Sequence, residues 1–264
     1  MRILFFGDIV AKPGRKAVTQ SLPKLREEFA PDFVFGNVEN LSHGLGVTPN
    51  ALQELIDAKF DGFTSGNHIY DKEAVFELFQ NASLPLLRPV NMPHEKVKGH
   101  DILELQHGSR KLIVMNFMGN AFFQEPYENP FTKIPEILET YKNERLAGII
   151  IDFHAEATAE KRALGFFLDG KVSAVLGTHT HVQTNDVQIL ENGTAYITDM
   201  GMSGTTNSII GASKSTLQKT FIEQQPFRYQ VEEEGPSEIA FVVIDIDPET
   251  QKTTKIVSYK RPVE

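Results

Sequence analysis

The first 80 residues contain three successive units in which a short apolar run ends in polar residues and a helical pattern follows. The apolar runs are 2–6, 33–35 and 60–64. The helical patterns begin near Pro13-Gly14, Thr48-Pro49 and Asp71, and Asp71 is typical of a helix N-cap. Units of this kind connect parallel strands through helices, so the sequence predicts an α/β fold with helices covering a largely parallel sheet.

The middle of the chain interrupts this alternation with a predicted hairpin about Gly108, and the alternation then resumes. The expected elements are strands at 101–105 and 111–117, a loop at 118–130, a helix at 134–141, a strand at 148–153, a helix at 159–168 and a strand at 172–176. The tail adds strands at 186–190 and 195–198, a Gly-, Ser- and Thr-rich loop at 203–215, a helix near 217–224, and strands at 238–246 and 255–259. Strands of both directions predict two mixed sheets packed face to face with helices outside, a four-layer α-β-β-α sandwich in a single domain of residues 1–264.

Composition restricts the chemistry of this chain. Cysteine is absent, which excludes disulfides, thiol nucleophiles and thiolate metal ligands. The net charge of -9 comes without a cluster of Lys and Arg, so we expect no large nucleic-acid groove. No run of about 18 apolar residues occurs and no cleavage-type signal follows the apolar start, so we expect no membrane span and a cytoplasmic location. Whether the chain forms a homo-oligomer stays open.

Polar residues suited to metal binding follow the C-terminal ends of five expected strands. They are Asp8, Glu39, Asn40, Asn67, His68, His154, His179 and His181. Taken singly, each has an ordinary structural explanation, such as a turn residue or a satisfied interior histidine. In open α/β sheets, however, ligands bind beyond the carboxyl ends of the strands, where distant positions meet. Carboxylate, amide and imidazole groups together suit a transition metal, so their shared placement favours a metal centre.

The spacing of His179 and His181 is typical of metal chelation, because both rings would lie on one side of an extended segment. A carboxylate such as Glu39 can in addition bridge two ions. Two ions about 3.5 to 4 Å apart can bind a hydroxide between them and clamp both oxygens of an in-line displacement at phosphorus. His68, beside Asn67, is then placed to protonate the leaving alkoxide or to stabilise charge on the phosphoryl oxygens, which is worth roughly 10² to 10⁴ in rate.

Several other residues carry weaker indications. Four histidines in loops or turns lack such neighbours, and we interpret them as structural; they are His43, His94, His100 and His107. Aromatic residues of the middle loop either stack a base or pack against the body or a second subunit; they are Phe122, Phe123, Tyr127 and Phe131. The loop 203–215 lacks the Walker spacing, so phosphate contact and a mobile surface loop both stay open.

The motifs Gly7-Asp8, Gly66-Asn67-His68, His154 and His179-Thr180-His181 form an ordered series across most of the chain. This series resembles the motifs of calcineurin-like metallophosphoesterases. Within that superfamily, segments 7–10, 36–40 and 177–181 are similar to the YmdB-like branch of bacterial cyclic-nucleotide phosphodiesterases.

The resemblance implies a metal-dependent phosphoric diester hydrolase that cleaves 2',3'- or 3',5'-cyclic nucleotides, with His68 as the catalytic acid. It implies one metal held by Asp8, Glu39, Asn40 and His181, and a second held by Glu39, Asn67, His154 and His179. The chain departs from the wider pattern by having Val10 in place of a histidine and Glu39 in place of an aspartate, and Asn40 would replace the missing ligand. The ions would be divalent or trivalent transition metals, with iron expected first and manganese or zinc as alternatives.

Two other functions stay open on the same residues. A phosphomonoesterase or protein phosphatase would use the same metal site but would need it open to a terminal phosphate or a peptide. A non-catalytic regulatory protein would retain the metals for stability or partner contact.

Overall fold

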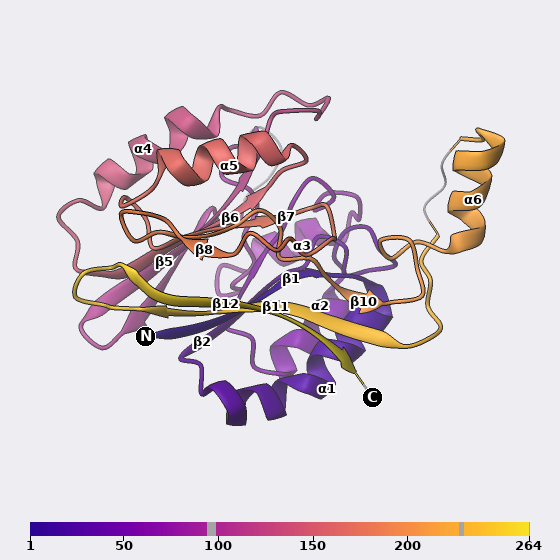
Figure 1. The fold of residues 1–264 in the computed structure, drawn as a ribbon, viewed down its shortest axis with the longest axis horizontal. Coiled ribbons are helices and arrows are strands. Elements are labelled where there is room, and N and C mark those ends of the chain that lie inside the picture. Colours follow the sequence, from indigo (N-terminus) through magenta and orange to yellow (C-terminus); the bar gives the residue numbers. More distant parts are fainter. Residues whose placement is uncertain (94–98, 227–229, 264) are drawn as a thin grey trace.

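The predicted α/β sandwich is confirmed in a computed structural model that describes residues 1–93, 99–226 and 230–263. Two six-stranded sheets face each other, and helices cover their outer sides (Figure 1). His94, which we interpret as structural, lies outside the described residues. Among these residues no helix has the length and apolar character needed to cross a bilayer.

The first sheet has the strand order β12-β11-β10-β1-β2-β3. Its strands are β1 (Arg2–Ile9), β2 (Phe33–Asn37), β3 (Gly62–Thr64), β10 (Met202–Thr205), β11 (Ser237–Ile246) and β12 (Thr253–Val263). Strand β1 runs parallel to β2 and β10, and β2 runs parallel to β3, whereas β11 is antiparallel to β1, β10 and β12. Helices α1 (Ala11–Phe29) and α2 (Pro49–Asp57) lie on its outer side (Figure 1).

The second sheet has the order β4-β5-β6-β7-β9-β8. Its strands are β4 (Ile102–His107), β5 (Arg110–Met118), β6 (Leu146–His154), β7 (Ala174–Thr178), β8 (Gln188–Ile189) and β9 (Ala195–Ile197). The predicted hairpin is confirmed, because β4 and β5 pair antiparallel, while β5, β6, β7 and β9 are parallel. Helices α4 (Pro130–Thr140) and α5 (Thr158–Phe167) cover the outer side of this sheet (Figure 1).

Both faces of the central strands are buried, which explains their continuous apolar runs. In β1, Ile3 and Phe5 belong to the cluster that fills the space between the two sheets, together with Ile150 of β6. Leu4 and Phe6 belong to the cluster under α1 and α2. Successive side chains of a strand point to opposite faces, so one strand serves two apolar layers.

Two local predictions are wrong. Helix α3 (Val75–Gln80) begins later than expected, with Ala74 as its N-cap, so Asp71 caps no helix. The expected loop 203–215 begins with β10, which pairs with β1 in the first sheet and is fully buried. Helix α1 and strand β10 lie in close contact. A Cβ on Gly14 of α1 would come within 2.4 Å of the Ser203 carbonyl oxygen of β10, so glycine fits at this point of the helix.

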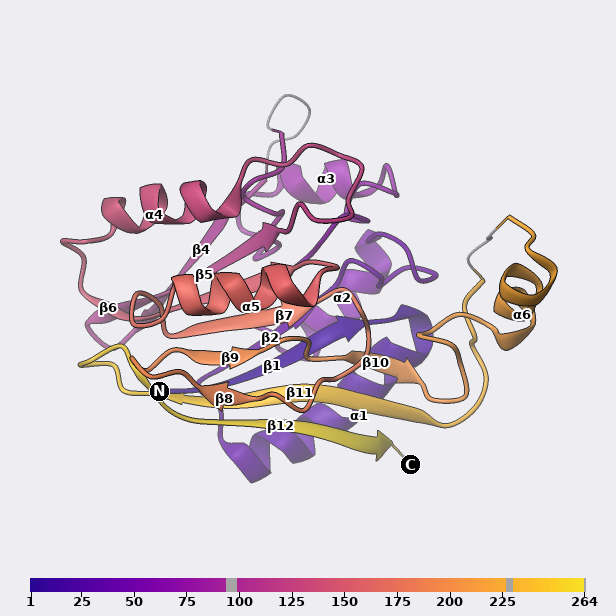
Figure 2. The ribbon, with the colours of Figure 1, turned by 45° about the horizontal axis from the view of Figure 1, so that its top comes forward.

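The parallel strands of both sheets end on one side of the molecule. Figure 2 shows the arrowheads of β1, β7 and β10 on the side from which α6 (Lys214–Glu223) projects. This shared direction places the residues that follow β1, β2, β3, β6 and β7 at one edge of the sandwich.

Candidate metal centre

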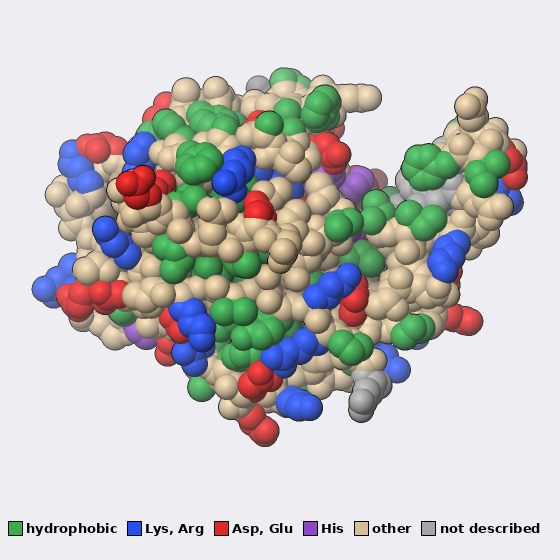
Figure 3. All heavy atoms as spheres, in the orientation of Figure 1, with side chains coloured by type: hydrophobic (Ala, Val, Ile, Leu, Met, Phe, Trp, Pro, Cys, Tyr) green, Lys and Arg blue, Asp and Glu red, His purple; other side chains and the backbone are tan. Residues whose placement is uncertain are grey.

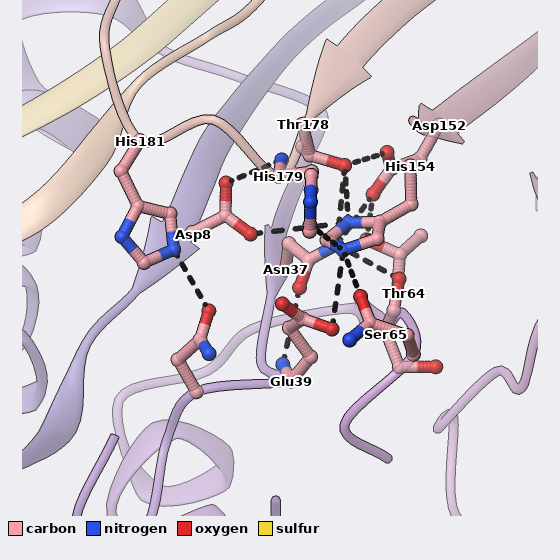
Figure 4. A network of polar contacts seen from close by, with 12 residues as sticks. Asp8, Asn37, Glu39, Thr64, Ser65, Asp152, His154, Thr178, His179 and His181 are labelled. Carbon is pink, nitrogen blue, oxygen red and sulfur yellow. Dashed lines mark hydrogen bonds and ion pairs between the residues drawn. The ribbon is translucent and has the colours of Figure 1, made fainter. Parts of the chain in front are cut away.

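The structure brings all of the predicted site residues to this edge. Asp8 lies near the end of β1, Glu39 and Asn40 follow β2, Asn67 and His68 follow β3, His154 ends β6, and His179 and His181 follow β7. Figure 4 shows most of these side chains pointing toward one another from both sheets. Asp8, Glu39, Asn40 and His154 are buried.

A first group of donor atoms surrounds Nε2 of His154. Oε2 of Glu39 lies 3.1 Å away, Nδ1 of His179 lies 3.0 Å away, and Oδ1 of Asn67 lies 3.2 Å away. Adjacent ligands of an ion with bonds of about 2.1 Å lie roughly 3 Å apart when they meet at right angles. The distances from Nε2 of His154 to these three atoms are therefore of the length expected between ligands of one cation.

The tautomer of His154 supports the same interpretation. The hydroxyl of Thr178 donates to Asp152 at 2.6 Å, so its oxygen accepts from Nδ1 of His154 at 2.9 Å (Figure 4). Nε2 of His154 therefore faces the Glu39 carboxylate, an acceptor, so a proton or a cation has to lie between the two atoms. The carboxylate of Glu156 lies 3.0 Å from Nε2 of His179, which likewise leaves the Nδ1 lone pair of His179 facing the group.

A second group of donor atoms lies around His181. Its Nδ1 donates to the carbonyl oxygen of Ile210 at 2.8 Å, so Nε2 carries the lone pair. Nε2 lies 3.0 Å from Oδ1 of Asn40, whose amide nitrogen donates to the Gly44 carbonyl oxygen at 2.9 Å. Two acceptors facing each other at hydrogen-bond distance are repulsive unless a proton or a cation lies between them.

Glu39 belongs to both groups. Among the described residues, one set of ligand atoms combines Glu39 with His154 and His179, and another combines Glu39 with Asp8 and His181; in each set the atoms lie within 4.8 Å of one another. The Glu39 side chain is 1% exposed. A buried carboxylate shared by two donor groups has the geometry of a bridging ligand.

The charges of the site also fit bound cations. Burial raises the pKa of Asp8 to about 7, in spite of the attraction of His181 and His154. Oδ2 of Asp8 accepts from the His179 backbone N–H at 3.1 Å, whereas Oδ1 has no hydrogen-bond partner among the described residues. Burial by itself lowers the pKa of His154, but Glu39, Asp8 and Asp152 together raise it to about 9. The site thus contains more hydrogen-bond acceptor atoms than the protein has donor groups there to satisfy.

A buried carboxylate connects the two sheets beneath these groups. Asp152 of β6 accepts from Thr178 of β7, from Thr64 of β3 and from Nδ2 of Asn37 in β2. Each of these hydrogen bonds fixes the end of a strand that is followed by a proposed ligand (Figure 4). The sequence analysis missed Asp152 and Asn37, although a carboxylate inside the apolar strand β6 was a signal that could have identified Asp152.

The HxH segment is not extended, so the expectation that both rings lie on one side is wrong. His179 and His181 have φ angles of 103° and 65°, and their rings join different groups of donor atoms. The segment is held by Asp199, which accepts from the Thr180 backbone N–H at 3.0 Å and from Nζ of Lys161 at 2.8 Å. Lys161 and Asp199 are both buried, and the sequence analysis identified neither.

His68 lies beside the donor groups but belongs to neither of them. Its Nδ1 lies 2.7 Å from Oδ2 of Asp71, and its backbone N–H donates to Glu39 at 3.2 Å. Its side chain is 33% exposed and lines a cleft of about 560 Å³. The other lining residues are Glu39, Asn40, Leu45, Glu156, His179, Thr180, His181 and Ile210.

The four aromatic residues of the middle loop do not line this cleft. Tyr127 is buried in the cluster under α1 and α2, and Phe131 packs against Phe167. Phe123 lies with its ring 5.1 Å from that of His179, and Phe122 is 84% exposed. Packing against the body thus accounts for three of the four.

The histidines that we interpret as structural lie away from the donor groups where the structure describes them. The side chain of His43 is 83% exposed, and His100 contacts the carbonyl oxygen of Ala82. The ring of His107 lies 6.2 Å from that of Phe33.

Comparison with known proteins places the chain in a family. A family model described as YmdB-like protein matches residues 4–259. The 2',3'-cyclic-nucleotide 2'-phosphodiesterase of Bacillus subtilis is 44% identical over 97% of this chain and 95% of its own length. A putative phosphatase/phosphodiesterase of Mycoplasma genitalium is 33% identical over 97% of this chain and 91% of its own.

Two solved structures have a similar fold over nearly the whole chain. A hypothetical protein from Thermus thermophilus matches with a TM-score of 0.90 and 36% identity over 99% of both chains. A novel phosphatase from Mycoplasma pneumoniae matches with a TM-score of 0.93 and 29% identity, covering 99% of this chain and 93% of its own.

The fold is that of the metallophosphoesterases. The chain belongs to the YmdB-like family. The prediction of a metal-dependent phosphoric diester hydrolase is thereby confirmed, and a non-catalytic regulatory role is not supported.

Replacing Lys161 with methionine should strongly destabilise the protein, because the substitution leaves the Asp199 carboxylate buried without its cation. Breaking one side of a buried ion pair costs about 3 to 5 kcal/mol in the free energy of unfolding. Guanidinium denaturation measures this. The matched control is Lys260→Met, which removes an exposed ion pair with Glu238 and should leave the midpoint nearly unchanged. Equal midpoints for both variants would show that the Lys161 pair does not hold the HxH segment.

Proposed function

We propose that this chain is a two-metal phosphodiesterase that hydrolyses 2',3'-cyclic nucleotides, with 3',5'-cyclic nucleotides as a second substrate class. The observation that carries the proposal is the buried Glu39 carboxylate shared by two groups of donor atoms. The activity named for the Bacillus subtilis relative supports the substrate, as does a cleft of a size that suits one small ligand.

The proposed ligand sets follow the two groups of donor atoms. One metal is held by Asp8, Glu39, Asn40 and His181, and the other by Glu39, Asn67, His154 and His179. The distances among these side chains support this assignment, as does Oδ1 of Asp8, which has no hydrogen-bond partner among the described residues. Oxygen and imidazole donors without thiolate are compatible with iron, manganese and zinc, and we expect iron first.

Bound cations and residues of the cleft would have different roles in hydrolysis. Bound cations would activate the attacking water and neutralise charge on the phosphoryl oxygens. His68 gives a proton to the ribose oxygen that leaves phosphorus, so ring opening yields a nucleoside monophosphate. Asp71 accepts the Nδ1–H of His68 and thereby orients the ring, with Nε2–H as the acid. The backbone contact between His68 and Glu39 fixes this acid beside the metal centre.

A phosphomonoesterase is the second candidate. The printed names of the two Mycoplasma relatives contain the word phosphatase. The cleft is also lined in part by a solvent-exposed residue, Ile210. A cytoplasmic location stays a prediction, and the oligomeric state stays open.

The function is tested by metal analysis and a substrate panel. Protein purified without added metal should contain two transition-metal ions per chain, and chelation should abolish turnover that the returned metal restores. Cyclic nucleotides of both classes should be cleaved faster than p-nitrophenyl phosphate. Faster cleavage of p-nitrophenyl phosphate would instead assign the chain to the phosphomonoesterases.

Glu39→Gln keeps the side-chain shape but removes the bridging charge. We expect turnover to fall to background and metal content to fall below two ions per chain, because an amide is a poor bridge between cations. Glu54→Gln on α2 is the matched control and should retain both properties, since Glu54 is half-exposed and lies outside the cleft. Near-normal turnover in a folded Glu39→Gln variant would reject the bridge.

His68→Ala should retain both metals while turnover falls by at least about tenfold, because the variant has lost its general acid. The loss should be greatest for poor leaving groups such as a ribose alkoxide and smallest for p-nitrophenolate. His107→Ala serves as the control, since His107 lies in β4 away from the cleft. Loss of a metal on the His68 substitution would make His68 a ligand.

A further inference from the structure

The cleft beside the metal centre is lined by two chemically different kinds of side chain. Some are proposed ligands or His68, and two are aliphatic, Leu45 and Ile210. Figure 3 shows histidine side chains at the foot of a hollow between the body and the α6 helix, with hydrophobic side chains near its rim. Phosphate hydrolysis uses only the polar lining residues, so the two aliphatic side chains require their own explanation.

Ile210 is held in the cleft by a constrained turn. Its φ angle is 47°, a conformation that is rare for a β-branched residue and costs free energy. Ile209 and Ala212 exchange backbone hydrogen bonds of 2.9 and 3.0 Å across the turn, and Gly211 N–H donates to Ser208 at 3.0 Å. The Ile210 carbonyl oxygen accepts from His181, so this aliphatic side chain and a proposed metal ligand are fixed to each other.

Leu45 is held by a second compact loop. The Gly46 backbone N–H donates to the Glu39 carbonyl oxygen at 2.6 Å, and the Ser42 backbone N–H donates to the Gly46 carbonyl oxygen at 2.9 Å. Nδ2 of Asn40 closes the same loop by donating to the Gly44 carbonyl oxygen. Leu45 is thus tied through backbone contacts to Glu39 and Asn40, just as Ile210 is tied to His181.

We propose that Leu45 and Ile210 form the nucleobase subsite, and this inference rests on the proposed phosphodiesterase function. With its phosphate at the metal centre, the rest of a bound nucleotide would lie in the same cleft as Leu45 and Ile210. Flat bases stack on apolar as well as aromatic side chains, and Ile210 keeps 46% of its surface exposed for such contact. The exposed aromatic residue of the middle loop, Phe122, does not line the cleft.

The test compares a nucleotide with the same molecule lacking its base. Calorimetry on the metal-loaded protein measures the Kd of adenosine 3'-monophosphate and of methyl ribofuranoside 3-phosphate, which has a methoxy group in place of adenine. We expect the nucleotide to bind at least about tenfold more tightly, the smaller effect seen for apolar pocket contacts. Ile210→Ala and Leu45→Ala should each weaken nucleotide binding severalfold and leave binding of the baseless phosphate unchanged.

Ile209→Ala is the matched control, because Ile209 has the same chemistry in the same turn but does not line the cleft. It should keep the wild-type preference for the nucleotide. Ile210→Val should restore most of the preference lost in Ile210→Ala. With 2',3'-cyclic AMP as substrate, the loss in Ile210→Ala should fall on KM and spare kcat.

Three results would overturn the subsite. These are equal affinity of the wild-type protein for both phosphates, equal weakening of both phosphates in Ile210→Ala, and a loss of preference in Ile209→Ala as large as in Ile210→Ala. Failure of the proposed function gives a different pattern, since binding is measured without turnover. A protein that prefers the nucleotide but does not cleave cyclic nucleotides would retain the subsite and lose the phosphodiesterase assignment.

Discussion

The site depends on one physical constraint, which is the gathering of acceptor atoms in a buried volume that holds too few donors. Glu39, Asp8 and Asn40 present oxygens there, and the histidines present lone pairs because their other nitrogens face acceptors of the protein. Such an arrangement is costly without positive charge, since desolvated acceptors repel one another. The fold tolerates that cost because surrounding hydrogen bonds fix each side chain in place.

Those surrounding bonds explain why the site needs both sheets. Asp152 connects β6 with strands β2, β3 and β7, and the pair of Lys161 and Asp199 holds the segment after β7. Glycines complete the arrangement where no side chain fits. A Cβ on Gly66 would come within 2.3 Å of Oε2 of Glu39 and 2.4 Å of Nε2 of His154. The chemistry is therefore supported by interactions that span more than 100 residues of sequence.

Most of the fold could be predicted because its signals are local. Apolar runs such as residues 2–6 and 148–153 are strands, and the Gly108 turn makes a hairpin. The failures lie where tertiary contacts outweigh local preference. Asp71 has the side chain of a helix cap, yet it contacts His68, and the small residues of β10 complete the first sheet instead of forming a loop.

The sequence by itself determined which residues stand at strand ends, because the period of the apolar pattern sets where each strand stops and which polar group follows. Only the tertiary structure decided how those groups are shared. It separates His179 from His181 through left-handed backbone angles, and places Glu39 in both groups of donor atoms. It also brings Leu45 and Ile210 into the same cleft as the ligands. The physical reason is that such geometry arises from the packing of two sheets, whose relative position no local segment encodes.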